Sequence, residues 1–374
     1  MSAAPPLPRW ADIGLLPVIN LAIALVVSGL VVLAVGEDPF RAIDVMIQGA
    51  FFYEGSFGYT LYYTTNFIFT GLAVSVAFHA LLFNIGGEGQ AYIGGLGAGL
   101  ACLALDAVLP GLVLIPIAIV AAAAFGAGWA LVPAWLQAYR GSHVVITTIM
   151  FNFIAAGVMV SLLAGPLIKR GQSSPTSRGF EESAHLPDMQ EFLGFFGIEV
   201  ARSPLNLSFL LAIAACVFVW LLIWRTRFGY AVRTLGHSPR AAAYAGIRIP
   251  RTIIVAMAIS GGLAGLMAVN EVLGVQHRLL LNFTAGYGFT GIAVSLMGRN
   301  HPIGIVLASL LFGVLYQGGS ELDLEFQTIT RDMLLVIQGL IILFSGALAY
   351  MLNPALARLI ATVVAHRESR EAPA

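Results

Sequence analysis

The segment from Asn84 to Gln90 reads NIGGEGQ and interrupts one of the most apolar stretches of the chain. Its Asn84, Glu88 and Gln90 side chains supply one acid and two amides, which are groups that can hydrogen-bond a polar solute. Glycine-rich loops also cradle phosphate groups, but that chemistry needs the pattern Gly-x-x-x-x-Gly-Lys-Ser/Thr. The chain has a single lysine, Lys169, far from this segment. The segment is therefore a turn between helices or a break within a membrane helix.

A second polar pair lies on a stretch that predicts a helix over residues 143–166. Thr148 and Asn152 are four residues apart and therefore share one face of that helix. Polar groups at membrane depth either hydrogen-bond another helix or line a watery path. Both alternatives stay open for this pair and for the polar residues of the 84–90 segment. Three more polar residues are expected nearer the membrane interface, namely Asn66, Asn270 and Gln276.

Enzymatic and metal chemistry are not indicated. The seven histidines are scattered and form neither His-Glu-x-x-His nor a Cys/His cluster with zinc spacing. A Gly-x-Ser-x-Gly nucleophile motif is missing as well. Cys102 and Cys216 belong to separate apolar segments, so neither a disulfide nor a thiolate site is predicted. We expect no catalytic residue, no metal site and no cofactor bound by this chain.

The composition indicates an all-α integral membrane protein. Of the 374 residues, 59% are hydrophobic and 10% are charged, and the mean hydropathy is +0.88. A soluble domain has about 25% charged residues. The net charge of zero argues against nucleic acid as a partner, because binding phosphates needs a basic surface.

Apolar runs of about 20 residues, the length that crosses a bilayer, predict about ten transmembrane helices. They cover residues 13–35, 62–83, 91–109, 112–137, 143–166, 206–224, 251–272, 281–297, 302–318 and 331–351. This pattern divides the chain into an N-terminal tail (1–12), a transmembrane domain (13–351) and a C-terminal tail (352–374). Two polar segments interrupt the domain, residues 167–205 and residues 225–251.

Basic residues orient the predicted helices. With the N-terminus inside, the inner segments hold twelve of the nineteen Lys and Arg residues but four of the nineteen Asp and Glu residues. Cytoplasmic loops gather Lys and Arg, so both termini and residues 225–251 are predicted to be cytoplasmic and residues 167–205 external. No Lys or Arg between Arg41 and Arg140 holds the NIGGEGQ segment inside as a cytoplasmic turn. A broken helix at membrane depth is therefore favoured there.

The stretch LGHSPRAAAYAGIRIP predicts a short helix outside the bilayer. Ser238 suits the N-cap, Pro239 the first helical position and Gly246 the C-terminal stop. Such a short helix is marginal in isolation. It is expected either to pack in a partner's groove or to lie on lipid headgroups. Its small apolar surface comprises Ala241, Ala242, Tyr244, Ala245 and Ile247.

At this loop the chain resembles the permease subunits of bacterial ATP-binding cassette (ABC) importers, in the branch that serves branched-chain amino acids, simple sugars and nucleosides. The pattern Gly-x-x-x-x-Ala-Ala-x-x-x-Gly-Ile of that family is matched by Gly236, Ala241, Ala242, Gly246 and Ile247. Three other segments are similar and occur in the expected order, FNIGGEGQ (83–90), ITTIMFNFIA (146–155) and GFTGIAVSLMGRNHPIG (288–304). The nucleoside and simple-sugar permeases are the most similar branch.

The resemblance implies a translocation path for a nucleoside or a simple sugar and a cytoplasmic coupling helix. It also implies that ATP and Mg²⁺ are bound by a separate ATPase subunit. Further expected partners are a second permease copy or paralogue, a periplasmic or lipoprotein solute-binding protein, and the lipid bilayer of the bacterial inner membrane. The alternative is an ion-coupled secondary carrier of a small polar solute. It is disfavoured because the candidate membrane acids are few, namely Glu88, Asp106 and Glu271.

Overall fold

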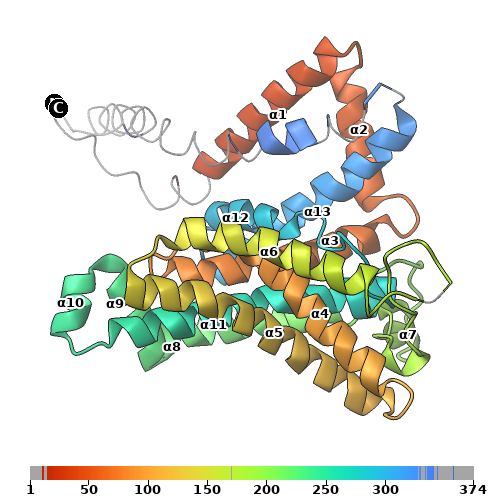
Figure 1. The fold of residues 1–374 in the computed structure, drawn as a ribbon. Coiled ribbons are helices and arrows are strands. Elements are labelled where there is room, and N and C mark those ends of the chain that lie inside the picture. Colours follow the sequence, from red (N-terminus) through yellow and green to blue (C-terminus); the bar gives the residue numbers. More distant parts are fainter. Residues whose placement is uncertain are drawn as a thin grey trace, which may run out of the picture. The chain divides into compact units, whose positions relative to one another are not determined.

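The computed structural model describes residues 15–169 and 171–326, together with residues 11, 328, 329, 333, 335–340, 343 and 357. These residues form helices joined by turns and loops, with no β-strand among them (Figure 1). The chain divides into two compact units, residues 1–49 with 318–374, and residues 50–317. Helix α13 (Pro302–Glu325) crosses the boundary between them.

The smaller unit contains α1 (Leu16–Ala34) and most of α2 (Pro39–Phe51). The two helices form a bent pair with an angle of 115°. Within this unit, Arg41 Nη2 donates to Glu325 Oε1 at 2.7 Å. Helix α1 matches the predicted span over residues 13–35. The sequence did not predict α2, because its charged residues dilute the apolar run that signals a membrane span.

The larger unit contains the remaining helices. They are α3 (Ser56–Phe78), α4 (Gly87–Leu105), α5 (Gly111–Arg140), α6 (Val144–Ala164), the short η2 (Glu182–Ala184), α7 (Met189–Gly194), α8 (Ser208–Arg225), α9 (Arg227–His237), α10 (Pro239–Tyr244), α11 (Ile249–Ala268), the π-helical η3 (Val269–Gln276) that continues α11, and α12 (Tyr287–Met297). Helices α3 and α11 are mostly buried, whereas α5, α6 and α8 expose most of their apolar surface. The core is therefore built around α3 and α11.

Small residues bring three of these helices into close contact. A Cβ atom on Gly126 of α5 would collide with the backbone oxygen of Gly261 on α11. A Cβ atom on Gly94 of α4 would collide with the backbone of Gly265, which is also on α11. Helices in lipid associate through such close backbone approach, because burial of apolar surface gives little driving force there.

Six described helices are long and apolar enough to cross a membrane, or seven if the bent pair of α1 and α2 is one span. Seven is three fewer than the ten predicted, and three predicted spans account for that difference. Residues 91–109 correspond to the glycine-rich α4, which starts earlier, at Gly87. The prediction of a single helix over residues 281–297 is wrong, because the chain is irregular as far as residue 286 and the helix begins only after it. Residues 331–351 lie largely outside the described part of the chain.

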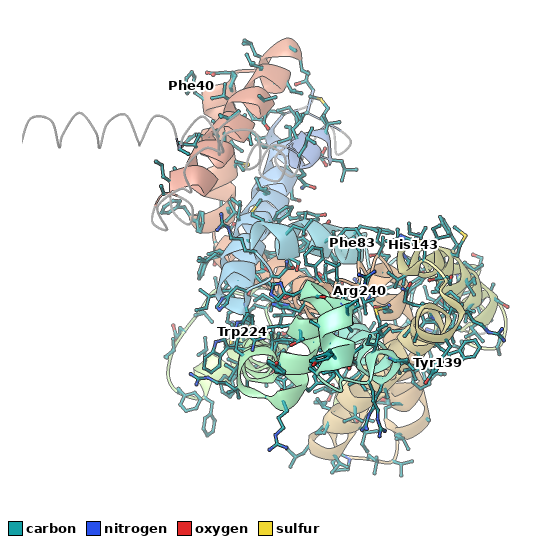
Figure 2. The ribbon with its side chains drawn as sticks, turned by 90° about the vertical axis from the view of Figure 1, so that its left-hand side faces the viewer. Phe40, Phe83, Tyr139, His143, Trp224 and Arg240 are labelled. Carbon is teal, nitrogen blue, oxygen red and sulfur yellow. The ribbon has the colours of Figure 1, made fainter. Side chains whose placement is uncertain are left out.

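The helix ends of the larger unit gather in two groups. In the first, the end of α3, the end of α8 and the turn before α13 meet through His79, Trp224 and His301, with ring centroids 5.2 and 5.0 Å apart. Helices α9 and α10 and the turn between α5 and α6 lie at this end, which faces the viewer in Figure 2. The second group contains residues 167–205, the end of α4 and the end of η3.

Candidate functional site

Two irregular segments lead into the starts of α4 and α12, residues 79–86 and residues 277–286. The two helix starts touch, because a Cβ atom on Gly288 would collide with the backbone of Glu88. The neighbouring Tyr287 ring packs on Phe67 with centroids 5.5 Å apart. Since Phe67 lies in the middle of α3, the contact lies at mid-height of a membrane-length helix. The NIGGEGQ segment thus forms one half of a junction between two helix starts, and its place as a break at membrane depth stays a prediction.

The Glu88 carboxylate joins the two halves of this junction. Its Oε1 accepts a hydrogen bond from the Gly286 amide at 3.0 Å, and its Oε2 accepts one from the Gly288 amide at 2.8 Å. Glu88 lies in the first turn of α4 and accepts hydrogen bonds from backbone amides at the start of α12. One negative charge therefore faces the positive ends of two helix dipoles.

The amides of Asn84 and Gln90 brace the segment that precedes α4. Asn84 Nδ2 donates to Gln90 Oε1 at 2.9 Å, and Gln90 Nε2 donates back to Asn84 Oδ1 at 3.1 Å. Asn84 Nδ2 also donates to Ser260 Oγ on α11 at 2.9 Å, and the Gly86 amide donates to Asn84 Oδ1 at 2.9 Å. Both amide side chains are buried, so these bonds replace the contacts that water would make.

The polar pair on α6 holds the same segment from the other side. Asn152 Oδ1 accepts from the Gly89 amide at 2.9 Å, and its Nδ2 donates to the Ile85 carbonyl at 2.9 Å. Thr148 Oγ1 accepts from the Ile85 amide at 3.3 Å. All five predicted path residues therefore belong to the 84–90 segment or hydrogen-bond to it. These contacts are made within the chain, as the helix-to-helix alternative expects, and a role in solute passage stays a prediction.

A second buried network was not predicted from the sequence. Glu271 Oε1 accepts from Tyr62 Oη at 2.5 Å and from Asn66 Nδ2 at 2.6 Å. Asn270 Nδ2 donates to Asn66 Oδ1 at 2.8 Å, and Asn206 Nδ2 donates to Asn270 Oδ1 at 2.9 Å. Asn66 and Asn270 are both buried within the chain, and their expected position near the membrane interface stays a prediction. The four-residue spacing of Tyr62 and Asn66, which gives them one helix face, was the available signal.

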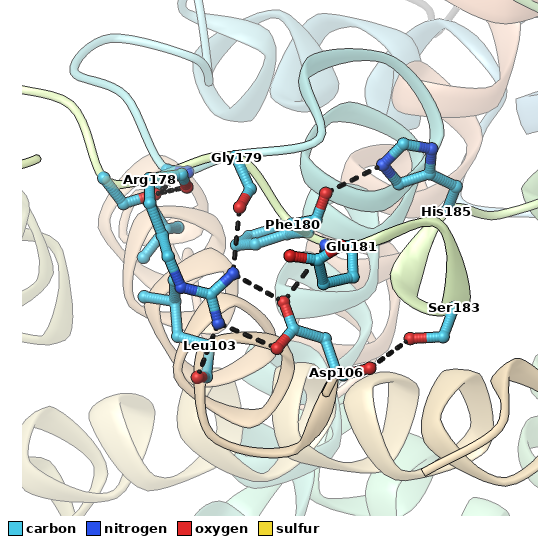
Figure 3. A network of polar contacts seen from close by, with 10 residues as sticks. Leu103, Asp106, Arg178, Gly179, Phe180, Glu181, Ser183 and His185 are labelled. Carbon is cyan, nitrogen blue, oxygen red and sulfur yellow. Dashed lines mark hydrogen bonds and ion pairs between the residues drawn. The ribbon is translucent and has the colours of Figure 1, made fainter. Parts of the chain in front are cut away.

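At the other group of helix ends, an ion pair anchors residues 167–205 to the end of α4 (Figure 3). Arg178 Nη1 donates to Asp106 Oδ2 and Arg178 Nη2 donates to Asp106 Oδ1, each at 2.7 Å. The Glu181 amide donates to Asp106 Oδ2 at 3.1 Å, and Ser183 Oγ donates to the Asp106 carbonyl at 2.6 Å. The hydrogen bonds from Arg178 hold the pKa of Asp106 below its ordinary value. The predicted external loop is thus an ordered structure.

The segment of the resemblance contains a capped helix of six residues, α10. Ser238 Oγ accepts from the Ala241 amide at 3.2 Å, and Pro239 is the first helical residue. Gly246 has a φ of +75°, a left-handed conformation, and the Ile247 amide donates to the Ala242 carbonyl at 3.0 Å. This is the ending that glycine favours after a helix.

The directions of the side chains on α10 differ from the expected apolar surface. Tyr244 is 98% exposed and Ala241 is exposed, whereas Ala242 is fully buried against the rest of the chain. Gly236 on α9 packs so closely on the His79 carbonyl that no Cβ would fit. Gly236 and Ala242 therefore hold the α9–α10 region against the rest of the chain, and Tyr244 and Arg240 are exposed. Arg240 is labelled in Figure 2.

Comparison with known proteins places these features in a family. The family model described as "Branched-chain amino acid transport system / permease component" matches residues 56–346. The glucose ABC transporter permease protein TsgB13 of Haloferax volcanii is 33% identical over 339 residues, which are 90% of this chain and 88% of the relative. The guanosine ABC transporter permease protein NupP of Bacillus subtilis is 32% identical over 88% of this chain and 92% of its own. The nucleoside ABC transporter permease protein NupB of Lactococcus lactis is 30% identical over 88% of this chain and 90% of its own.

Proposed function

Because the chain belongs to the permease component family of branched-chain amino acid transport systems, we propose that it forms the translocation path for a nucleoside or a simple sugar in an ABC importer. Members of this family are transporter subunits of the inner membrane that do not hydrolyse ATP themselves. The observation that carries the proposal is that three permeases named for glucose, guanosine and nucleosides align with at least 88% of this chain. The secondary carrier finds no support in these relatives.

The proposal assigns ATPase docking to α10 and its flanks. The capped ends of α10, its fully exposed Tyr244 and the adjacent arginines make an outward-facing unit at the end of the helices. The closely packed Gly236 and the buried Ala242 would transmit a push on this unit to the segment before α4, because Gly236 touches the His79 backbone there. ATP and Mg²⁺ would be bound by the ATPase subunit.

The proposal also keeps ten passes through the inner membrane, with both termini in the cytoplasm. Helices α4 and α12 then make two of these passes together with the irregular segments before them, and residues 331–351 make the last. Buried hydrogen bonds around Asn84, Glu88 and Asn152 support this arrangement, because irregular backbone at membrane depth needs protein partners. The solute would pass near Asn84, Glu88, Gln90, Thr148 and Asn152, which brace the junction.

The importer would further contain a second permease, as a copy or a paralogue, and an external solute-binding protein. The exposed apolar faces of α5, α6 and α8 would contact lipid or that second permease. The anchored segment over residues 167–205 would lie on the side of the solute-binding protein. The ion pair between Arg178 of this segment and Asp106 at the end of α4 holds the segment in place on that side.

Uptake of labelled guanosine and glucose tests the proposal in cells that express the chain with its ATPase and solute-binding protein. We expect Tyr244→Asp to lower ATP-dependent uptake about tenfold or more, since an interface centre tolerates a buried charge poorly. Tyr139→Asp is the matched control, because Tyr139 is also exposed at this end but lies on α5.

Both variants must be present in the membrane at the level of the parent. Normal uptake by Tyr244→Asp would show that α10 is not the docking element. Uptake that collapses with the proton gradient while cellular ATP is maintained would instead establish the secondary carrier. Uptake of neither solute by the parent would contradict the proposed substrate class.

A further inference from the structure

A cavity of about 310 Å³ lies at the end of the helices that carries residues 167–205. Its lining includes Tyr59 from the first turn of α3, Asp188 at the start of α7, Arg202 and Ser203 before α8, and His277 at the end of η3. Tyr59 and Arg202 are exposed, so solvent reaches the cavity. Its volume is at the lower end of the range of about 300–1,000 Å³ typical of small-molecule sites. The cavity therefore has room for one sugar ring or one nucleoside.

The backbone around this cavity is well defined. Residues 188 and 206 form an isolated antiparallel bridge, and the Met189 amide donates to the Leu205 carbonyl at 2.8 Å. The Leu186 amide donates to the Leu273 carbonyl on η3 at 3.0 Å. These bonds fix the segments that carry Asp188 and Arg202 relative to η3. The lining is therefore held by hydrogen bonds between segments far apart in the sequence.

The two charges of the lining attract each other through space but lie too far apart for a direct ion pair. Neither the Asp188 carboxylate nor the Arg202 guanidinium makes a side-chain hydrogen bond or an ion pair with a described residue. Burial, followed by the nearby Glu191, raises the pKa of Asp188, so this carboxylate is incompletely solvated. Hydrogen bonds to charged groups are stronger than neutral ones. An incoming ligand can thus satisfy both groups.

His277 adds a neutral polar group in an unusual position. Its φ of +49° is a left-handed conformation that residues other than glycine rarely adopt. Its ring stacks on His185 with centroids 3.8 Å apart, and its Nδ1 is buried without a hydrogen-bond partner. Burial lowers the pKa of His277, with the His185 ring adding to the effect. A lowered pKa favours the neutral imidazole, which has one donor and one acceptor nitrogen.

We propose that this cavity binds the sugar ring of the transported solute on the outer side of the permease, an inference that rests on the proposed function. Asp188 would accept hydrogen bonds from ring hydroxyls, and Ser203 would donate to them. Arg202 and His277 would form further hydrogen bonds with the same hydroxyls. The half-exposed ring of Tyr59 offers a face for a base or for the sugar C–H groups. Opposite charges sum to zero across the cavity, which favours a neutral polyhydroxyl compound over a phosphorylated one.

Direct binding tests this proposal on the full chain in lipid nanodiscs, without ATPase or solute-binding protein. Titration calorimetry would use guanosine, ribose, glucose, ribose 5-phosphate and leucine as probes. We expect guanosine or one of the free sugars to bind, and Asp188→Asn to weaken that binding about tenfold or more. Glu199→Gln is the matched control, because Glu199 is an exposed acid of the same loop that does not line the cavity.

A steric variant gives a second, independent measurement. A Cβ atom on Gly58 would collide with Ser203 Oγ, so Gly58→Ala should narrow the cavity without changing a charge and should also weaken binding. Equal affinity in the parent and Asp188→Asn overturns the proposal, as does tighter binding of leucine or ribose 5-phosphate. If the parent takes up guanosine or glucose in cells but binds neither alone, the cavity proposal fails and the proposed function stands. If uptake also fails, both are wrong.

Discussion

The Glu88 carboxylate is accommodated among apolar helices because backbone amides surround it. An isolated charge at membrane depth is costly. Two amide hydrogen bonds and two helix starts offset that cost at Glu88. Glu271 follows the same principle with Tyr62 and Asn66 as donors. At the scale of single residues, the partly buried Glu88 and the buried Glu271 are each explained by donors from another segment.

Asp106 allows a test of one such acid outside the membrane. Its side chain is 1% exposed and that of Arg178 is 41% exposed. Because Arg178 depresses the pKa of Asp106, the pair stabilises the folded chain above the carboxyl's unfolded pKa of about 4. That stability should be lost as the pH falls through the lower, folded pKa. At pH 7, Asp106→Asn should cost about 1–3 kcal/mol.

Thermal unfolding in nanodiscs at pH 7 and at pH 3 to 4 measures this effect. Other carboxyl groups also titrate over this range, so the difference between parent and Asp106→Asn is the informative quantity. We expect this difference to shrink at the acidic end. A difference that is independent of pH over this range would contradict a charged Asp106 as the stabilising group.

At the scale of elements, the junction of α4 and α12 depends on glycine. Gly288 lets the two helix starts touch, and a Cβ atom there would collide with the Glu88 backbone. Gly288→Ala should therefore destabilise the chain by about 1–3 kcal/mol, the usual range for overpacking. It should also weaken solute uptake, because the junction would open. Unfolding temperature in nanodiscs and uptake in cells are the two measurements.

Gly128→Ala is the matched control for this change. Gly128 is also a helical glycine, on α5, but a Cβ atom there would meet nothing within 4 Å. Alanine should be neutral at that position or stabilise the helix by up to about 1 kcal/mol. If Gly288→Ala behaved like Gly128→Ala, the close contact of the two helix starts would not exist in the protein.

At the scale of the whole molecule, the proposed topology places α10 in the cytoplasm and α7 with its loop outside. Tyr244 and Phe195 are 98% and 88% exposed in these two regions, and Cys102 and Cys216 are buried. A membrane-impermeant maleimide should label Phe195→Cys in spheroplasts. It should label Tyr244→Cys only after the membrane is permeabilised. Labelling in the reverse order would invert the proposed orientation.

Several features followed from the sequence because they depend on short stretches of chain. Composition and the length of apolar runs determined the membrane class, since both reflect the solvent around the helices. The ends of α10 were predictable because Ser238, Pro239 and Gly246 act on the backbone next to them. The resemblance to ABC permeases rested on local motifs of the same kind, and the family model confirmed it.

Other features were decided only by the tertiary structure, because they join residues far apart in the chain. The contact of Glu88 with Gly286 and Gly288 spans about 200 positions, and neither glycine carries a polar side chain that would mark it. The inward direction of Ala242 depends on how α10 is seated against the rest of the fold. NIGGEGQ by itself indicated a broken helix. Only packing with the start of α12 determined which backbone amides satisfy its acid, because a carboxylate in an apolar interior takes the donors that the fold brings to it.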